Sequence, residues 1–473
     1  MSGQHLTRRR LLGGLCASAA GLLVAACGAP APEPTKAPEK PAQPAQPAPT
    51  PTPQPAAKPT AAVTPVAATK PAAGEQVKIV FFTWGWAERF KVWRDDVVGG
   101  FNKAHPNIVA ELLEGPSEYE SKLLTMAAGG VAPDVFRLSQ SYSIDVFAKG
   151  FCMELDSYLK RDSFVIEDYT SPPYAQCKYK GKWYGVPHGA AGNFVLWYNR
   201  DLFKAAGVPF PKDDWAWDDF VAAAKALTKD TNGDGKVDQW GTSSGIATGG
   251  AMPFAVIWSN GGEELTEDGK SFELDKPPAM EAQRLLVDLH LKHKVVPMPG
   301  EIPQGLGDIF LSGKVAMHYS GAWYEVTAKT AKFDFGIVLN PKMRAGQVAY
   351  AEQNVTSGYK GSKYPDACWA FLRHLISEEN QKVESLSGLN GPSMPKILQS
   401  SEFQEVKGPP YSRKPIVPNL LCKTRGIPLI PQARKFRDAY RQKTGAVWTG
   451  ERKLEEVIPE VVEAAKKIIA ENA

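Results

Sequence analysis

The chain has 473 residues, of which 43% are hydrophobic and 22% charged, and its formal net charge is +4. Three of the positive charges, Arg8, Arg9 and Arg10, stand close to the N-terminus, so the chain beyond them is near neutral, which argues against nucleic acid as a partner. After the N-terminal segment no stretch approaches the roughly 20 apolar residues of a membrane-spanning helix.

Residues 1–26 have the layout of a cleaved export signal. A basic start is followed by a mildly apolar run that is too short to cross a bilayer and ends in small residues. Residues 24–27, Val-Ala-Ala-Cys, resemble the bacterial lipobox, in which the cysteine becomes the lipidated N-terminus, and the twin arginines resemble a Tat signal. We therefore expect lipidation at Cys27 and an extracytoplasmic protein, anchored by its lipid to the outer face of the cytoplasmic membrane.

Residues 27–76 contain the expected lipidated cysteine and a tether. Residues 29–75 contain no aromatic residue and hold 14 of the chain's 39 prolines. Such a composition cannot bury enough apolar surface to fold, so we predict an extended, disordered linker.

The remaining block of nearly 400 residues is long for one core, so two lobes are expected. It carries four cysteines, Cys152, Cys177, Cys368 and Cys422, which allow three pairings that the sequence cannot distinguish. Their number fits an oxidising compartment. The closeness of Cys152 and Cys177 in the sequence favours a disulfide between them, and four free thiols are the alternative.

Short apolar runs alternate with amphipathic helices along this block. The pattern predicts strands at 77–82, 108–113 and 135–136 with helices at 88–103 and 119–128, an order that implies parallel strands and a three-layer α/β lobe. A second series begins with a strand at 194–198 and continues through a helix at 218–227. Residues 452–469 have the apolar spacing of a final helix packed on a lobe.

Several segments resemble one family in the same order along the chain. These are AAGGVAPDVF at 127–136, the stretch 180–227 with GKWYGVP, LWYNRDLFKAAGVPFP and WAWDDFVAAAKALT, SGKVAMHYSGAW at 312–323, and the turn and helix at 360–381. The chain resembles the extracellular solute-binding proteins of ABC importers, in the carbohydrate-type group that includes maltose-binding protein.

The resemblance implies an α/β fold of type II, a two-lobed clamshell like the periplasmic binding proteins, in which each lobe is a sheet flanked by helices and hinge strands join the lobes. Lobe 1 would comprise 77–190 plus 356–395, and lobe 2 would comprise 191–350 plus 396–473. A ligand held between the lobes would favour the closed state, which the membrane permease of the importer can distinguish from the open one. The protein is expected to act as a monomer.

Ligands of α/β sheets collect beyond the carboxyl ends of the strands. Reading the predicted strands to their ends gives ten candidate ligand-binding residues: Trp84, Trp86, Ser139, Gln140, Tyr142, His188, Asn193, Trp323, Asn354 and Asn390. Aromatic rings and planar amides suit the apolar faces and hydroxyl rims of sugars, so a di- or oligosaccharide is the expected ligand. Trp197, Trp215 and Trp369 stand in stretches where packing in the core is the better interpretation.

The segments after the first and third strands lack the carboxylates that carbohydrate binders frequently place there, so the identity of the sugar stays open. Glu88 and Asp145 could reach the cleft, but each stands where a helix N-terminus would also favour an acid.

Residues 230–238 resemble the start of an EF-hand calcium loop, with oxygen ligands at Asp230, Asn232, Asp234 and Asp238. Position 12 of that loop would be Gly241, so the bidentate glutamate is missing. The choice lies between a structural calcium ion and a tight Asn/Asp/Gly turn. No other cofactor is expected.

No catalytic motif stands out, so we predict a binding protein and not an enzyme. Two alternatives remain. One is the same importer role with a non-sugar ligand, such as a polyamine, iron or a phosphodiester. The other is a tethered glycoside hydrolase, which would need two carboxylates flanking a cleft.

Overall fold

The computed structural model describes residues 76–470, apart from 117, 170–174, 191–193, 244–251, 267–270, 299, 303–307, 351–352, 406–410, 417–423 and 426–431. These residues all belong to one compact unit, Val63–Ala473. The signal segment, Cys27, the tether, Asn193 and Cys422 lie outside the described residues, so what the sequence indicates for them stays a prediction.

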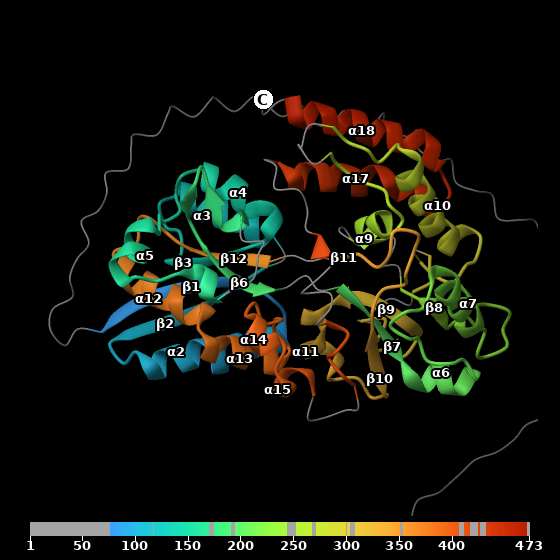
Figure 1. Ribbon diagram of the computed structural model, residues 1–473, viewed down its shortest axis with the longest axis horizontal. Helices are drawn as coiled ribbons and strands as arrows, with labels where there is room; N and C mark the ends of the chain where they lie inside the picture. Colours follow the sequence, from blue (N-terminus) through green and yellow to red (C-terminus); the bar gives the residue numbers. More distant parts are fainter. Residues whose placement is uncertain are drawn as a thin grey trace, which may run out of the picture. The chain divides into compact units, whose positions relative to one another are not determined.

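The first sheet has the strand order β2-β1-β3-β12-β6 (Figure 1). Strands β1 (Val77–Trp84), β2 (Ile108–Gly115) and β3 (Val135–Leu138) run parallel. Strand β12 (Gln353–Gly358) is antiparallel to β3 and to β6 (Val186–Ala190). The carboxyl ends of β1, β2, β3 and β6 therefore share one edge of the sheet with the amino end of β12.

The helices that follow the first strands agree closely with the sequence pattern. Helix α1 (Ala87–Val92), a π-helical turn (Trp93–Val98) and α2 (Gly99–Ala104) form the helical run expected at 88–103, and α3 is Tyr119–Ala128. The other elements of this part of the chain are α4 (Gln140–Ala148), α5 (Asp156–Asp162), 3₁₀ turns at Ile166–Tyr169 and Ala175–Cys177, β4 (Lys178–Tyr179), β5 (Lys182–Trp183), α12 (Pro365–Ile376), α13 (Glu378–Ser387) and α14 (Pro395–Leu398).

The second sheet has the order β10-β7-β9-β8. Strand β7 (Phe194–Asn199) is antiparallel to both β9 (Val315–Gly321) and β10 (Phe335–Val338), whereas β8 (Trp240–Thr242) is parallel to β9. The sequence pattern predicts a second series of parallel strands beginning at 194–198, and this prediction is wrong. Residue patterns predict that a strand is buried, but its direction depends on partners more than 100 residues away.

Helices surround the second sheet and extend beyond it. They are α6 (Arg200–Ala206), α7 (Trp217–Leu227), α9 (Met252–Ser259), α10 (Pro277–Leu291), the 3₁₀ turn η4 (Ala322–Tyr324), α11 (Glu325–Ala328), α15 (Ser401–Gln404), α17 (Ala433–Trp448) and α18 (Leu454–Ala470), with a small sheet of β11 (Ala349–Tyr350) and β13 (Thr424–Arg425). Both ends of helix α6 are set by local sequence. The Asn199 side chain accepts hydrogen bonds from two backbone N–H groups at the start of the helix, and Gly207, with φ of 65°, ends it.

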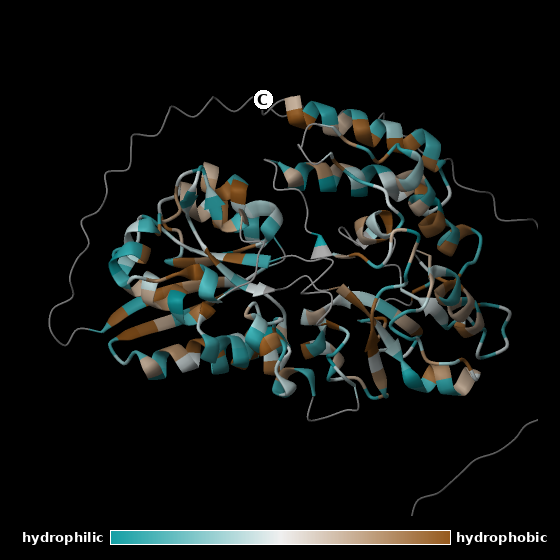
Figure 2. Cartoon of the chain, in the orientation of Figure 1, coloured by the Kyte–Doolittle hydropathy of each residue, from teal (hydrophilic) through white to brown (hydrophobic). Residues whose placement is uncertain are grey.

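Each sheet has its own apolar core. Figure 2 shows apolar residues, in brown, along the strands of both sheets. The first lobe, defined as the β2-β1-β3-β12-β6 sheet with its helices, buries Phe81, Trp93 and Trp369. The second lobe, defined as the β10-β7-β9-β8 sheet with its helices, buries Trp215 in one cluster and Trp197 in another. The core assignment of Trp197, Trp215 and Trp369 is confirmed. None of the helices in the described part of the chain has the length and apolar character needed to span a bilayer.

The predicted disulfide between Cys152 and Cys177 is wrong, because both are buried free thiols. Cys152 forms an isolated bridge with Tyr359 beside the end of β12, whereas Cys177 ends the 3₁₀ turn before β4. Closeness in the sequence did not bring the two thiols together, since each is held by its own backbone pairing. Burial raises the pKa of the Cys152 thiol to about 12, which keeps it protonated and unreactive.

Candidate cleft site

A cavity of about 510 Å³ opens at the edge where the carboxyl ends of the first sheet's strands meet, and residues of both lobes line it. From the first lobe come the ends of β1, β2 and β3 and the start of α3. From the second come the first residue of β7, η4 and the start of α17. The lining residues are Trp84, Gly85, Trp86, Arg89, Pro116, Glu118, Tyr119, Glu120, Ser121, Arg137, Ser139, Phe194, Trp323, Asn354 and Arg434.

Three half-buried tryptophans give the cavity its aromatic surface. Trp86 of the first lobe and Trp323 of the second meet edge to face, with ring centroids 5.7 Å apart and planes at 66°. The Trp86 indole also donates a 2.9 Å hydrogen bond to the hydroxyl of Thr327 in α11. Trp84 packs edge to face on Tyr119 at 5.2 Å. Indole rings held at several angles offer flat surfaces to more than one face of a ligand.

Acidic and basic side chains lie together at the start of α3. Glu120 accepts a 2.6 Å hydrogen bond from Ser139 and forms an ion pair with Arg434 of α17. The Arg434 guanidinium also lies 5.4 Å from the ring centroid of Tyr142 in α4. This group joins the two lobes through polar contacts on the cavity wall.

Two guanidinium groups lie behind the tryptophans of the first lobe. The Cζ atom of Arg89 is 5.1 Å from the Trp86 ring centroid, and that of Arg137 is 4.8 Å from the Trp84 ring centroid. Arg89 is 3% exposed and Arg137 is fully buried. Both donate to a single atom, Asn390 Oδ1, at 3.3 Å and 3.0 Å.

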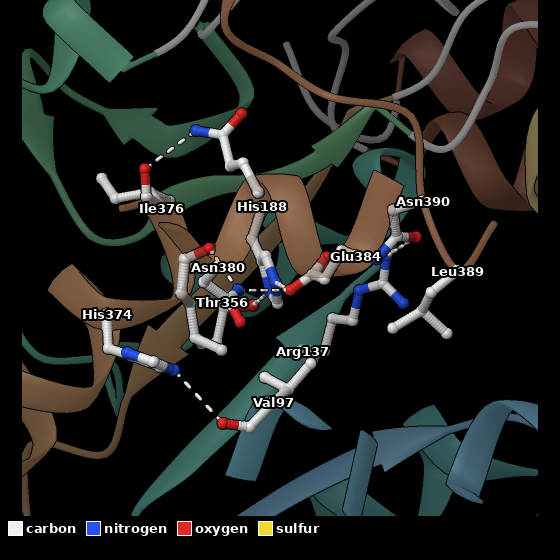
Figure 3. A network of polar contacts seen from close by, with 12 residues as sticks. Val97, Arg137, His188, Thr356, His374, Ile376, Asn380, Glu384, Leu389 and Asn390 are labelled. Carbon is white, nitrogen blue, oxygen red and sulfur yellow. Dashed lines mark hydrogen bonds and ion pairs between the residues drawn. The ribbon is translucent and has the colours of Figure 1, made fainter. Parts of the chain in front are cut away.

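Glu384 of α13 supplies the negative charge of this buried cluster (Figure 3). Its carboxylate accepts hydrogen bonds from Asn390 Nδ2 at 2.7 Å and Asn380 Nδ2 at 2.6 Å, and it lies 2.8 Å from His188 Nε2. His188 Nδ1 in turn lies 2.8 Å from the hydroxyl of Thr356 on β12. The cluster thus connects α13 with the strands β3, β6 and β12.

The pKa values of these groups follow from burial and charge. Burial lowers the pKa of both Arg89 and Arg137. For Glu384, burial alone would raise the pKa, but His188, Asn390 and Arg137 outweigh it, and the pKa lies below its ordinary value. Glu384 is therefore ionised at neutral pH.

Five of the ten predicted ligand-binding residues line the cavity: Trp84, Trp86, Ser139, Trp323 and Asn354. The other four described ones do not. His188 and Asn390 belong to the buried cluster, Gln140 accepts a hydrogen bond from the backbone of Gln353, and Tyr142 packs against Arg434. Asn193 lies outside the described residues.

Sequence reasoning missed the charged residues of the cavity. Glu118 and Glu120 follow the second strand within five residues of its end at Gly115, so the rule that ligands collect beyond strand ends also points to them. No local signal marks Arg89, Arg137 or Arg434. The two acids near helix starts, Glu88 and Asp145, do not line the cavity. Glu88 is exposed, and Asp145 accepts a hydrogen bond from the backbone of Gln432 at 3.0 Å.

In the loop that resembles a calcium site, the aspartate side chains accept hydrogen bonds from backbone N–H groups of the same loop. Asp230 accepts from the N–H groups of Gly233 and Gly235 at 2.7 Å and 2.8 Å, and Asp234 accepts from that of Lys236 at 2.8 Å. Asp238 binds Thr231 and lies 3.2 Å from the Lys314 ammonium. Among the described residues no group of three or more His, Cys, Asp or Glu is arranged to hold a metal. Calcium at this loop stays a prediction.

Two α/β lobes with an aromatic cavity between them define the class of two-lobed binding proteins of the periplasmic type. Residues 83–382 match the family model described as bacterial extracellular solute-binding protein, and the chain belongs to this family. The members and structural neighbours of this family are binding proteins and not enzymes.

Similar proteins include a putative binding protein of Brucella abortus, 26% identical over 298 residues, which span 60% of this chain and 68% of that protein. Among solved structures, an ABC substrate-binding protein from Listeria monocytogenes in complex with cycloalternan has a TM-score of 0.76 and 26% identity, over 84% of this chain and 100% of that one. The maltose/maltodextrin-binding domain MalE from Bdellovibrio bacteriovorus, bound to maltotriose, has a TM-score of 0.69 and 21% identity, over 83% of this chain and 100% of that one.

Proposed function

We propose that this protein is a lipid-anchored substrate-binding protein that captures a di- or oligosaccharide between its lobes and delivers it to an ABC permease. The observation that carries the proposal is the cavity of about 510 Å³ lined by Trp84, Trp86 and Trp323 from two lobes. Aromatic rings bind the apolar faces of pyranose rings, and the flanking hydroxyl, amide and carboxylate groups can bind sugar hydroxyls.

The family membership and the cycloalternan complex of the similar Listeria protein support a carbohydrate ligand. Contacts that require both lobes, such as Trp86 with Trp323, would be available only when the lobes are closed. Binding would then shift the population toward a closed state that a permease can recognise, and one copy of the chain suffices for this.

The charges of the cavity argue against the polyamine alternative. Arg434 lines the cavity beside the carboxylates of Glu118 and Glu120, and the buried guanidiniums of Arg89 and Arg137 lie against the tryptophans of its wall. A polycation would need an excess of acids, and these three guanidiniums outnumber the two carboxylates of the lining.

The same carboxylates bear on the hydrolase alternative. Glu118 and Glu120 both come from the start of one helix, so they lie on one side of the cavity. Glycoside hydrolysis needs two carboxyl groups on opposite sides of the scissile bond. We therefore favour binding without catalysis.

A binding screen tests the ligand. The soluble domain should be titrated with mono- and oligosaccharides, amino acids, spermidine and iron while its melting is followed. A ligand at 100 times its dissociation constant adds about 2.7 kcal/mol of stability, which raises Tm by a few degrees. We expect shifts only with carbohydrates. A shift with spermidine or iron and none with any sugar would overturn the carbohydrate assignment and leave the importer role standing.

Anchoring has a separate test. Cys27→Ser should release soluble protein from the membrane fraction, because the lipidated thiol is lost. Replacing Arg8 and Arg9 by lysine should block export if the signal is of the Tat type. Retention of the Cys27→Ser protein in the membrane fraction would refute the lipid anchor.

A further inference from the structure

The buried cluster behind the cavity has a feature that ordinary core packing does not require. Arg137 is fully buried, yet its Nε and Nη1 atoms have no hydrogen-bond partner. Its hydrogen-bonding contact is Nη2 to Asn390 Oδ1, at 3.0 Å. Its remaining contacts are aromatic, because the guanidinium lies between Trp84 at 4.8 Å and Trp93 at 5.2 Å.

This arrangement makes Asn390 the point that fixes the plane of the Arg137 guanidinium. Asn390 Oδ1 also accepts from Arg89 Nη2 at 3.3 Å, and Arg89 Nη1 donates to the Leu389 carbonyl at 2.9 Å. The Arg89 guanidinium lies against Trp86. One amide oxygen is therefore shared by the two cations that support the two cavity tryptophans of the first lobe. A cation on one face of an indole attracts it electrostatically, and burial strengthens that attraction.

Asn390 is itself held tightly. Its Nδ2 donates to Glu384 at 2.7 Å, and its amide group packs against Gly189, where a Cβ atom would come within 2.7 Å of Asn390 Cγ. Gly189 also has φ of 80°, which a side chain would strain. The backbone of β6 is thus shaped to admit Asn390 in this orientation.

We propose that Asn390, held by Glu384, is a positioning residue that sets the orientation of Trp84 and Trp86 through the guanidinium groups of Arg137 and Arg89. It does not touch the ligand, since it is 2% exposed and lies outside the lining of the cavity. The inference rests on the proposed function only in treating these rings as sugar-binding surfaces.

Asn380 offers a matched control. It is also 2% exposed and also donates to Glu384, at 2.6 Å, but its other bond goes to the backbone of Leu375. Asn380→Ala therefore removes a buried amide from the same carboxylate without removing a partner of either guanidinium. Asn390→Ala removes the acceptor that both guanidiniums share.

The decisive measurement needs no ligand. The near-ultraviolet circular dichroism of Trp84 is obtained as the difference between a protein and its Trp84→Phe counterpart, in the parent, Asn390→Ala and Asn380→Ala backgrounds. We expect the Trp84 signal to lose most of its intensity with Asn390→Ala and to be retained with Asn380→Ala. Far-ultraviolet spectra confirm that each protein is folded. If Asn390→Ala does not fold, Asn390→Ser, which withdraws the shared acceptor but keeps a polar group, replaces it.

A Trp84 signal that is unchanged by Asn390→Ala, or reduced equally by both substitutions, would overturn the proposal. With maltotriose as the probe, Asn390→Ala should weaken binding about tenfold and Asn380→Ala by less than about twofold. If the parent protein does not bind maltotriose, the sugar that raises Tm in the binding screen replaces it as the probe. If no sugar in the screen binds, the proposed function fails while the spectroscopic result still decides the role of Asn390.

Discussion

Each lobe buries a cluster of charged side chains, and the two clusters differ in their ratio of positive to negative groups and in how completely these groups are hydrogen-bonded. In the second lobe, Glu325 and Arg413 form a bidentate pair with N–O distances of 2.8 Å and 2.5 Å, and Tyr411 donates to the same carboxylate. The Arg413 Nη groups also donate to the carbonyls of Phe403 and Leu386, both at 3.1 Å. In the first lobe, the single carboxylate of Glu384 faces two buried guanidiniums, and nitrogens of both lack partners.

The difference separates a structural pair from a cluster that serves the cavity. A buried pair with complete hydrogen bonding offsets its own desolvation, whereas an excess of buried cations is costly. Arg89 and Arg137 lie against aromatic side chains that line the cavity. Among the described residues, Arg413 of the second-lobe pair lies against Phe403 instead, which is not part of the cavity lining. We therefore expect ligand binding to change when the first-lobe cluster around Glu384 is disrupted, and not when the second-lobe pair is.

The largest expected effect comes from Glu384→Gln. Glutamine keeps the shape but leaves two guanidiniums buried without a counter-charge, so the free energy of unfolding should fall by about 3 to 5 kcal/mol. Denaturant titration at pH 7 measures the loss, and the Trp84 signal should change as well. A loss below about 1 kcal/mol would show that the carboxylate is not needed to hold the cluster together.

Glu325→Gln should cost less, about 3 kcal/mol of unfolding free energy, because it leaves one fully buried guanidinium, that of Arg413, and the partly exposed Lys329. Denaturant titration again gives the value, and sugar affinity serves as the contrasting readout. We expect the affinity to be preserved. A fall in affinity as large as that for Asn390→Ala would remove the distinction between the clusters.

Trp323→Ala should act on binding rather than on stability. The ring is half-buried on the cavity wall, so its loss should weaken sugar binding by roughly 1 to 3 kcal/mol with little change in Tm. Calorimetric titration with the sugar found in the screen measures the first quantity and thermal melting the second. A large drop in Tm with unchanged affinity would make Trp323 a core residue.

The smallest effect at neutral pH belongs to His290 of α10, which contrasts with the partnered His188. Both ring nitrogens of His290 are buried without a hydrogen-bond partner, and burial lowers its pKa from 6.5 to about 4. Protonation therefore favours the unfolded state. The stability that the neutral ring contributes is complete above pH 6.5 and is lost as the pH falls toward 4, by up to about 1.4 kcal/mol per pH unit.

His290→Phe should reduce this slope between pH 6.5 and 4 and leave the unfolding free energy at pH 7 nearly unchanged. Urea titrations across that range measure the slope. His293→Gln is the comparison, because burial also lowers the pKa of this partly exposed neighbour and its removal should change the slope less. An unaltered slope in His290→Phe would mean that other groups carry the pH dependence.

Local pattern was sufficient for much of the fold. The alternation of apolar residues placed β1, β7 and α7 within two residues of their observed bounds, and apolar spacing located α18. Ordered family motifs and strand ends put Trp84, Trp86 and Trp323 at the cavity. These features depend on short-range spacing, which the sequence displays directly.

The tertiary structure decided the direction of β7 and the free state of Cys152 and Cys177. It also decided which polar side chains are buried and which line the cavity. Asn390 and Asn354 are both predicted from the sequence to contact the ligand. Asn390 lies behind the tryptophans, bonded to Arg137, whereas Asn354 lies on the cavity wall. Arg434 reaches Glu120 from more than 300 residues away. Such outcomes depend on which distant elements pack against a residue, so a strand-end position in the sequence alone cannot tell whether a polar group meets solvent or a buried charge.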